Sequence, residues 1–299
     1  MKVLCIGNSA YDITFPVDEY PKENVKYKIQ EQIECGGGSC GNAAYLLAKW
    51  GIETYFVGMV GDDVYGKRIR DEFRTIGVNT DYLILAPNYR TTTSHIIVNK
   101  ENGSRTILSY HPSQREMDDL DIELEEEPKV ILLDGREFSM SKKMIEKYPN
   151  AKKIIDASND KLEVKELCKL CDYVVCSKDF MKKVSGIDID DLNNLNAAFK
   201  VLEEMFNTTV VVTLEALGCA YRKYDEIVIV PTIQVKAVDT TGSGDIFHGA
   251  FAYAMMKNWD METSLKFSNL VGSLATTKYG GRNSMFELKD VEKVFNEIK

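Results

Sequence analysis

The segment 239–245, with the sequence DTTGSGD, places two glycines, a serine and an aspartate directly before the apolar segment 246–252. We expect a buried helix to begin near Gly244. The backbone at Gly242 and Gly244 can approach a ligand closely, because glycine has no Cβ. The first N–H groups of a helix have no partner within it, and together with the helix dipole they favour an anion such as a phosphate. The segment therefore predicts an anion-binding turn.

Asp245 adds a carboxylate to this turn. A site that only binds an anion gains nothing from a fixed negative charge, whereas phosphoryl transfer needs a base that takes the proton from the attacking hydroxyl. An exposed aspartate has a pKa of about 3.9 and is ionised at neutral pH without an activating neighbour. We therefore interpret Asp245 as a general base. The alternative is that the Thr, Ser and Asp side chains only cap a helix.

A second glycine-rich segment, 35–51, begins CGGGSCGN and continues as a helix that Gly51 ends. Its glycines match the dinucleotide-binding pattern in letters, but a polar alternating segment precedes them instead of a buried strand. They also have the spacing of a P-loop, yet Asn42-Ala43 stands where Lys-Ser/Thr is needed. A nicotinamide-dependent oxidoreductase thus stays open as an alternative, and a flexible linker does not suit the helix behind it. The segment best suits a hydroxyl-rich ligand bound by bare backbone and by Asn42.

Asp12 follows the apolar strand 3–7 at its expected carboxyl end, which is where open α/β sheets bind ligands. It is a candidate for binding a polyol hydroxyl, and a loop-capping role is the alternative.

Composition limits the class of protein. The chain has 299 residues, 44% of them hydrophobic, which suits one large α/β domain over residues 1–299 with an insertion. The net charge of −9 argues against nucleic acid or an anionic membrane as the main partner. Seven cysteines without a framework spacing, and no apolar run of about 18 residues, predict a cytoplasmic protein with reduced thiols. Cys168-x-x-Cys171 is interpreted as partly buried thiols, and three distant histidines offer no catalytic metal cluster.

Short apolar strands alternate with helices after Pro128. This rhythm predicts a doubly wound α/β fold, with a mostly parallel sheet and helices on both faces. The strands are expected at 130–133, 153–156, 173–176 and 210–213, and the helices at 139–148, 161–170, 179–185 and 190–206. Earlier elements are expected at 3–7, 54–60 and from about 62 to Gly77, and the last helices at 260–278 and 288–298.

Three segments have the pattern of strands with one face in water: 27–34, 91–99 and 104–110. The last two are joined by an Asn102-Gly103 turn. We expect a small β-sheet lid, inserted at about 13–35 and 89–111, which excludes water from the site. Its exposed face suggests a homodimer. The acidic run 116–127 is interpreted as a solvated connector.

With these residues in view, the whole chain resembles the ribokinase-like, or phosphofructokinase B, family of carbohydrate kinases. The segment 37–44 (GGSCGNAA) is similar to the family's N-terminal signature and 239–245 to its C-terminal one, in the right order and about 200 residues apart. The resemblance implies a transfer of the γ-phosphoryl group of ATP to a sugar hydroxyl, with Mg²⁺ as cofactor.

The resemblance also implies residue roles. Asp245 would be the catalytic base, and the backbone of Gly242, Ser243 and Gly244 the anion hole. The remaining roles it implies are a sugar site at Asp12, Gly37, Gly38, Ser39 and Asn42, a nucleotide site at Ser177, Thr213, Gly218, Thr241 and Gly244, and a K⁺ site at Asp239, Thr241, Gly280 and Ser284.

Two positions depart from the family pattern. Phe180 and Glu215 stand where the family commonly has a glutamate beside the magnesium and a glycine in the nucleotide strand. Asp179 would substitute for the first, or the metal would be held by phosphates and water. A non-catalytic sugar- or nucleotide-binding protein is the alternative that rests on these departures.

Some local strings are most similar to the ketohexokinases of the family: 103–110 (GSRTILSY), 134–136 (DGR) and 177–179 (SKD). They favour fructose or another ketohexose as substrate. Arg105 would then reach the substrate or the transferred phosphate from the lid, the alternative being a merely exposed arginine. Ribose, 2-keto-3-deoxygluconate and nucleosides stay open.

Overall fold

The fold was analysed in a computed structural model, which describes residues 1–112, 115–117 and 119–298. A large sheet forms its centre, in the strand order β14-β13-β12-β11-β10-β9-β1-β4-β5, with β6 paired to β4. These strands are β1 (Lys2–Ile6), β4 (Glu53–Gly61), β5 (Val78–Asn79), β6 (Leu83–Ala86), β9 (Val130–Leu133), β10 (Lys152–Ala157), β11 (Tyr173–Ser177), β12 (Thr209–Thr213), β13 (Cys219–Lys223) and β14 (Glu226–Val230).

Six neighbouring strands of this sheet, β12-β11-β10-β9-β1-β4, run parallel, as the alternation of strands and helices predicts. Their carboxyl ends therefore share one edge of the sheet. The hairpin β13–β14 extends this sheet with antiparallel pairing. That hairpin was not predicted from the sequence pattern.

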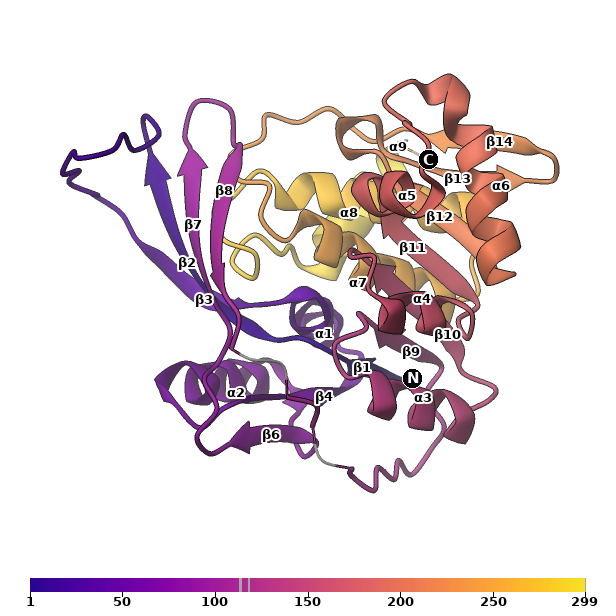
Figure 1. The fold of residues 1–299 in the computed structure, drawn as a ribbon, viewed down its shortest axis with the longest axis horizontal. Coiled ribbons are helices and arrows are strands. Elements are labelled where there is room, and N and C mark those ends of the chain that lie inside the picture. Colours follow the sequence, from indigo (N-terminus) through magenta and orange to yellow (C-terminus); the bar gives the residue numbers. More distant parts are fainter. Residues whose placement is uncertain (113–114, 118, 299) are drawn as a thin grey trace.

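Helices cover both faces of the sheet, so the doubly wound prediction is confirmed (Figure 1). Side chains along β1 alternate between two cores: Val3 and Cys5 pack with one set of helices, and Leu4 and Ile6 with the other. The first set is α1 (Ser39–Lys49), α2 (Val64–Ile76), α7 (Ser243–Met256), α8 (Met261–Ala275) and α9 (Leu288–Ile298). The second is α3 (Phe138–Lys147), α4 (Leu162–Cys168), α5 (Lys178–Ser185) and α6 (Leu195–Phe206). Short 3₁₀ turns lie at Leu192–Asn194 and Glu215–Leu217.

A second, four-stranded sheet forms the predicted lid and projects from one end of the molecule (Figure 1). Its order is β3-β2-β7-β8, and its strands are β3 (Ile33–Gly37), β2 (Ala10–Val17), β7 (Thr93–Asn99) and β8 (Arg105–Tyr110). The hairpin β7–β8 turns at Gly103 (φ 70°), as its Asn-Gly signal predicts.

The lid begins earlier than we expected. Asp12 lies within β2 and not in a loop after β1. The predicted strand over 27–34 was largely wrong, because residues 27–32 have no regular structure and β3 begins only at Ile33. Gly36 and Gly37 end that strand, so Gly38 alone (φ 86°) makes the turn into α1.

Candidate active site

Asp245 lies in the first turn of α7. The helix begins directly after Gly242, which has a positive φ of 74°. The Asn42 side-chain amide, in the first turn of α1, donates a hydrogen bond of 2.8 Å to Asp245 Oδ2. The two glycine-rich segments of the sequence therefore meet at this carboxylate.

The pKa of Asp245 is raised, because the surrounding protein removes water from the carboxylate, while the Asn42 hydrogen bond and the nearby His248 and Arg105 lower it. Our expectation of an ordinary exposed aspartate was therefore too simple. The residue as a whole is partly exposed, and the charge of its carboxylate depends on the balance between burial and these three neighbours.

The start of α7 is open to solvent where an anion would bind. Gly244 is exposed, and a Cβ added there would meet no atom within 4 Å. Its φ is not in the left-handed region, unlike that of Gly242, so its glycine is not required by the backbone conformation. Ser243, between them, is partly exposed.

Asp12 lies directly over the glycine turn. A Cβ on Gly37 would be 2.1 Å from Asp12 Oδ2, and one on Gly38 would be 2.8 Å from the backbone of residues 8–10. The pKa of Asp12 is raised to about 6, mainly by burial and also by the negative charges of Asp245 and Asp239. A hydrogen bond from Ser94 and the positive charge of Arg282 act in the opposite direction.

The loop 280–284 borders the site and contacts both glycine-rich segments. Asp239 accepts hydrogen bonds from the amides of Thr241 (2.9 Å) and Gly280 (2.8 Å), which joins this loop to the segment 239–245. A Cβ on Gly281 would be 3.2 Å from Asn42 Nδ2. Ser284 donates to the Gly281 carbonyl oxygen (2.8 Å), while the buried Thr241 hydroxyl has no hydrogen-bond partner.

Arg105 brings the lid to the same place. Its guanidinium donates to the Thr240 hydroxyl, and its charge acts on Asp245. Gly103, at the hairpin turn, packs against the backbone of residues 237–238. The lid hairpin thus contacts the anion-binding segment.

Ser177, Thr213 and Gly218 form a separate group at the carboxyl ends of β11 and β12. Ser177 and Thr213 are register partners, and Leu214 N donates to the Gly218 carbonyl oxygen (2.7 Å). The Ser177 hydroxyl accepts from Phe180 N (3.1 Å) and so begins α5. No contact of these three residues with Asp245 is observed.

Both departures from the family pattern have a structural explanation. Phe180 is fully buried and its ring lies 6.3 Å from that of Phe206, so it belongs to the core. Asp179 is exposed at the first turn of α5. Glu215 adopts φ 54°, so the chain keeps a left-handed turn where a glycine would be unstrained.

His248 and Asp156 are a buried pair behind Asp245 that sequence reasoning missed. His248 Nδ1 lies 2.6 Å from the Gly244 carbonyl oxygen, and Nε2 lies 3.1 Å from that of Val175 and 3.6 Å from Asp156 Oδ1. Burial raises the pKa of Asp156 to about 6, although the neighbouring His248 lowers it. The ring therefore ties the start of α7 to β10 and β11. In the sequence it was considered only as a metal ligand.

Asp134, at the end of β9, is a second missed residue. Its carboxylate accepts hydrogen bonds from the amides of Asn8 (2.7 Å), Arg136 (3.0 Å) and Cys40 (3.3 Å). Burial raises its pKa, and these hydrogen bonds act in the opposite direction. Asp134 thus fixes the beginning of both β2 and α1. Its only sequence signal was the local string DGR.

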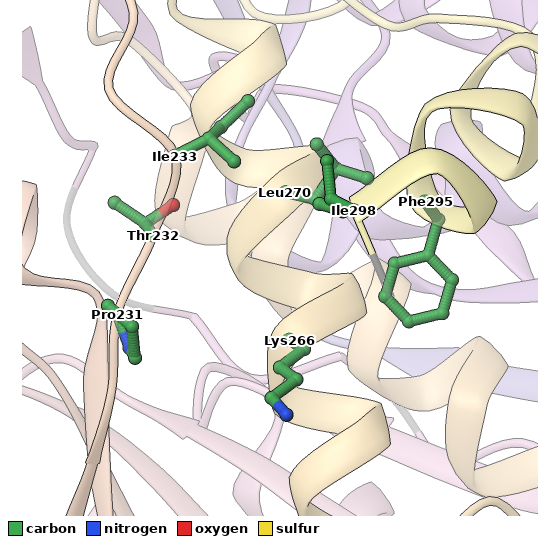
Figure 2. Close-up of a pocket in the computed structure, with 7 residues that line it drawn as sticks. All are labelled: Pro231, Thr232, Ile233, Lys266, Leu270, Phe295 and Ile298. Atoms are coloured by element: carbon green, nitrogen blue, oxygen red, sulfur yellow. The ribbon is translucent and has the colours of Figure 1, made fainter.

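A hollow of about 220 Å³ lies elsewhere, between residues 231–233, α8 and α9 (Figure 2). It is lined by Pro231, Thr232, Ile233, Lys266, Leu270, Phe295 and Ile298. This lining contains no carboxylate and no predicted site residue. We therefore do not assign the chemistry to it.

An α/β sheet with a separate lid sheet, and a carboxylate at an open helix start, is the arrangement expected of a small-molecule kinase. The chain belongs to the pfkB family of carbohydrate kinases, whose family model matches residues 1–287. It is therefore a phosphotransferase with an alcohol group as acceptor, a sugar kinase of the ribokinase-like class.

Two curated relatives align over nearly their whole length. Deoxyribokinase of Salmonella typhi is 26% identical, with 95% of each chain covered. Ribokinase of Bacillus subtilis is 25% identical, with 99% of this chain and all of its own length covered. These relatives act on pentoses by name and do not specifically support a ketohexose.

Solved structures confirm the fold. A structure from Agrobacterium tumefaciens superposes with a TM-score of 0.90 at 25% identity, covering 99% of this chain and 98% of its own. Ribokinase of Arabidopsis thaliana, solved with ribose and ATP, gives a TM-score of 0.79 at 24% identity, with 98% of both chains covered. Within the described residues, no helix is both long and apolar enough to cross a membrane.

Proposed function

We propose that this protein transfers the γ-phosphoryl group of ATP to a hydroxyl of a free sugar, with Asp245 as the base. The observation that carries the proposal is the Asn42–Asp245 hydrogen bond, because it joins the glycine turn to the open start of α7. One side of this junction suits a polyol and the other suits a phosphate.

The sugar would lie between Asp12 of the lid, the backbone of Gly37 and Gly38, and the side chains of Ser39 and Asn42. Asp245 would accept the proton of the attacking hydroxyl, which contributes about 10²–10⁴-fold to the rate. The amides of 242–244 would bind the transferred group, and one such donor contributes about 3–4 kcal/mol. Arg105 would reach the same group from the lid, since it already contacts Thr240.

ATP would extend from α7 toward Ser177, Thr213 and Gly218, with Thr241 and Gly244 beside its phosphates. Mg²⁺, when bound, would neutralise phosphate charge. Among the described residues no three His, Cys, Asp or Glu side chains gather where a metal ion could bind. We propose that Mg²⁺ is held mainly by phosphates and water. Asp239, Thr241, Gly280 and Ser284 are proposed to bind K⁺, supported by the unpartnered buried Thr241 hydroxyl.

We favour a pentose such as ribose or deoxyribose as the substrate, because the aligned relatives are a ribokinase and a deoxyribokinase. A ketohexose is the second candidate, on the strength of the string 103–110 that contains Arg105. Both classes offer hydroxyl groups to which Asp12 and Asn42 would bind.

Two further proposals concern the setting of the protein. All six residues of β8 are exposed, Ile107, Leu108 and Tyr110 among them, which supports a homodimer through the lid sheet. All seven cysteines are buried and unpaired, which supports a reducing cytoplasmic environment.

The decisive experiment is a coupled assay of ADP formation with ATP, Mg²⁺ and a panel of ribose, deoxyribose, fructose, 2-keto-3-deoxygluconate and nucleosides. We expect ADP formation that depends on one pentose or ketohexose. Sugar binding without ADP formation would instead indicate a non-catalytic binding protein. Titration with NADH, expected to show no binding, tests the oxidoreductase alternative.

A further inference from the structure

Arg282 is a buried charge in the loop 280–284, with 4% of its surface exposed. Its Nη1 donates to Glu72 Oε2 of α2 at 2.8 Å, and its Nη2 lies 3.3 Å from Ser9 Oγ and 3.4 Å from the Gly37 carbonyl oxygen. The Glu72 carboxylate in turn accepts the Gly36 amide, at 2.9 and 3.1 Å. The ion pair therefore holds the end of β3 at two points: Glu72 binds the N–H group of Gly36, and Arg282 binds the carbonyl oxygen of Gly37.

Aromatic rings fix the guanidinium in place. Its central carbon lies 4.5 Å from the ring centre of Phe73 and 5.2 Å from that of Tyr45. Contacts of this kind attract a cation to the face of the ring, more strongly when both are desolvated. The pair thus has little freedom to move.

The glycines of the turn accommodate this side chain. A Cβ on Gly36 would lie 1.9 Å from Arg282 Nη1, and one on Gly41 would lie 3.1 Å from Nη2 and 2.8 Å from Ser9 Oγ. Two of the three glycines that match the dinucleotide-binding pattern are therefore explained by an arginine of the same chain. A cofactor is not needed to account for them.

We propose that Arg282 and Glu72 form a positioning pair that holds the Gly36–Gly38 turn in the geometry that binds the sugar. The inference rests on the proposed function of that turn. The loop of Arg282 also reaches the catalytic side, since Gly281 packs against Asn42 and Gly242 and Gly280 bonds Asp239. Through this loop the sugar turn and the anion-binding segment keep one relative position.

The charge of Arg282 gives the pair a second effect. It lowers the pKa of Asp12, acting against burial and against Asp245 and Asp239. Removal of the charge should therefore favour protonated Asp12, whereas loss of a purely mechanical contact would not.

The test uses the full-length enzyme with Arg282→Met, Arg282→Lys and the double variant Arg282→Met with Glu72→Leu. We expect the sugar KM of Arg282→Met to rise about 10- to 100-fold, because small misplacements of binding groups have effects of this size. The ATP KM should stay within about twofold. The acid limb of the sugar kcat/KM profile should move to higher pH in Arg282→Met and less so in Arg282→Lys, which keeps the charge.

The double variant separates positioning from folding. Arg282 is buried and Glu72 is partly exposed. Replacing both partners avoids leaving one charge unpaired, which is the most destabilising change at such a pair, so this variant should fold while its sugar KM stays high. Lys49→Met is the matched control, because Lys49 bonds Glu287 (2.5 Å) and joins the same C-terminal region to the other end of α1. Its sugar KM should be unchanged.

Hydrogen exchange at the amides of 36–38 gives a readout without turnover. We expect it to become about tenfold faster in Arg282→Met, and to be unchanged in Lys49→Met. A folded Arg282→Met with wild-type sugar KM would overturn the inference, as would an equal rise of sugar KM in Lys49→Met. If Arg282→Met does not fold, the double variant and Arg282→Lys decide. A wild-type protein without sugar-dependent ADP formation would overturn the proposed function, while the exchange data would still test the pair.

Discussion

Asn42 and Asp245 are 203 positions apart in the sequence, yet a hydrogen bond of 2.8 Å joins their side chains. Each lies in the first turn of a helix, α1 or α7, and each helix follows a glycine with positive φ. The side-chain carbonyl oxygen of Asn42 is buried and has no partner within the protein. In the proposed function, Asn42 would orient the carboxylate with its amide nitrogen and accept from a sugar hydroxyl with this oxygen.

Asp245→Asn keeps the size of the side chain and removes the base. We expect kcat to fall at least 10²-fold, as is usual for the loss of a positioned base, with ATP affinity largely retained. ADP formation at saturating sugar and calorimetric titration with ATP measure the two effects. A variant that keeps more than about a tenth of wild-type turnover would show that the base is assigned wrongly.

Asn42→Ala removes a hydrogen bond that lowers the pKa of Asp245. The pKa of Asp245 should then rise, so that a higher pH is needed to ionise the base. We expect the acid limb of the kcat profile, measured at saturating sugar, to move to higher pH. An acid limb in the wild-type position would contradict the role of Asn42.

Gly37→Ala tests the close contact between the turn and Asp12, since the new Cβ would lie 2.1 Å from Asp12 Oδ2. The carboxylate must move, so the sugar KM should rise by about tenfold or more. Gly51→Ala is the control. An alanine at this position is strained, because φ is 76°, but it has open space around it. The substitution should therefore lower stability and leave the sugar KM unchanged. Equal sugar KM values for both variants would contradict this prediction.

Asp12→Asn should make the protein more stable at neutral pH. The pKa of Asp12 is about 6 in the folded protein and 3.8 is its ordinary value, so wild-type stability falls as pH rises from about 4 to 6. The shift corresponds to about 3 kcal/mol. Urea unfolding should show a gain for the variant at pH 8 that is nearly absent at pH 4, together with weaker sugar binding.

The exposed Asp18, just after β2, provides the control for this prediction. Asp18→Asn should change the free energy of unfolding by less than about 0.5 kcal/mol at either pH. Equal stability of wild type and Asp12→Asn at pH 8 would refute the buried charge.

Glu215→Gly should relieve backbone strain, because Glu215 is exposed and adopts φ 54°. A left-handed conformation costs a residue with a Cβ roughly 1–2 kcal/mol, partly offset by the greater freedom of glycine in the unfolded chain. We expect a net gain of about 0.5–1 kcal/mol in urea unfolding. Glu215→Ala keeps the strain and should bring no such gain. Equal effects of the two variants on stability would argue against backbone strain at this position.

The sequence predicted the parts of the fold that depend on local pattern. The apolar strands, the helices between them and the Asn-Gly hairpin of the lid follow from periodicity and turn chemistry. The polar residues 27–32 were wrongly expected to form a strand, since a half-solvated strand and an exposed loop share the same polar alternation. The hairpin β13–β14 was missed because its turn has no Asn-Gly or Asp-Gly signal; Tyr224 adopts the positive φ (56°) there instead.

The residues of the candidate site also fall into those that a local pattern indicates and those that depend on tertiary packing. Asp245, Asn42 and Gly37 stand in recognisable glycine-rich contexts, so their types and spacing indicated a role. Arg282, with glycine before it and asparagine after it, looks like an exposed loop residue. Its burial against Phe73 and Glu72 depends on the packing of α2, which no local pattern encodes.

Asp12 belongs to β2 of the lid, whereas Asn42 and Asp245 begin helices of the main body. A sugar that binds all three joins two parts of the molecule, so the energy of sugar binding also favours the closed position of the lid. The hydroxyl pattern of the acceptor would then decide how often the phosphates are shielded from water. A poor acceptor would consequently leave the phosphates exposed to water for more of the time, which would raise the rate of ATP hydrolysis relative to that of transfer.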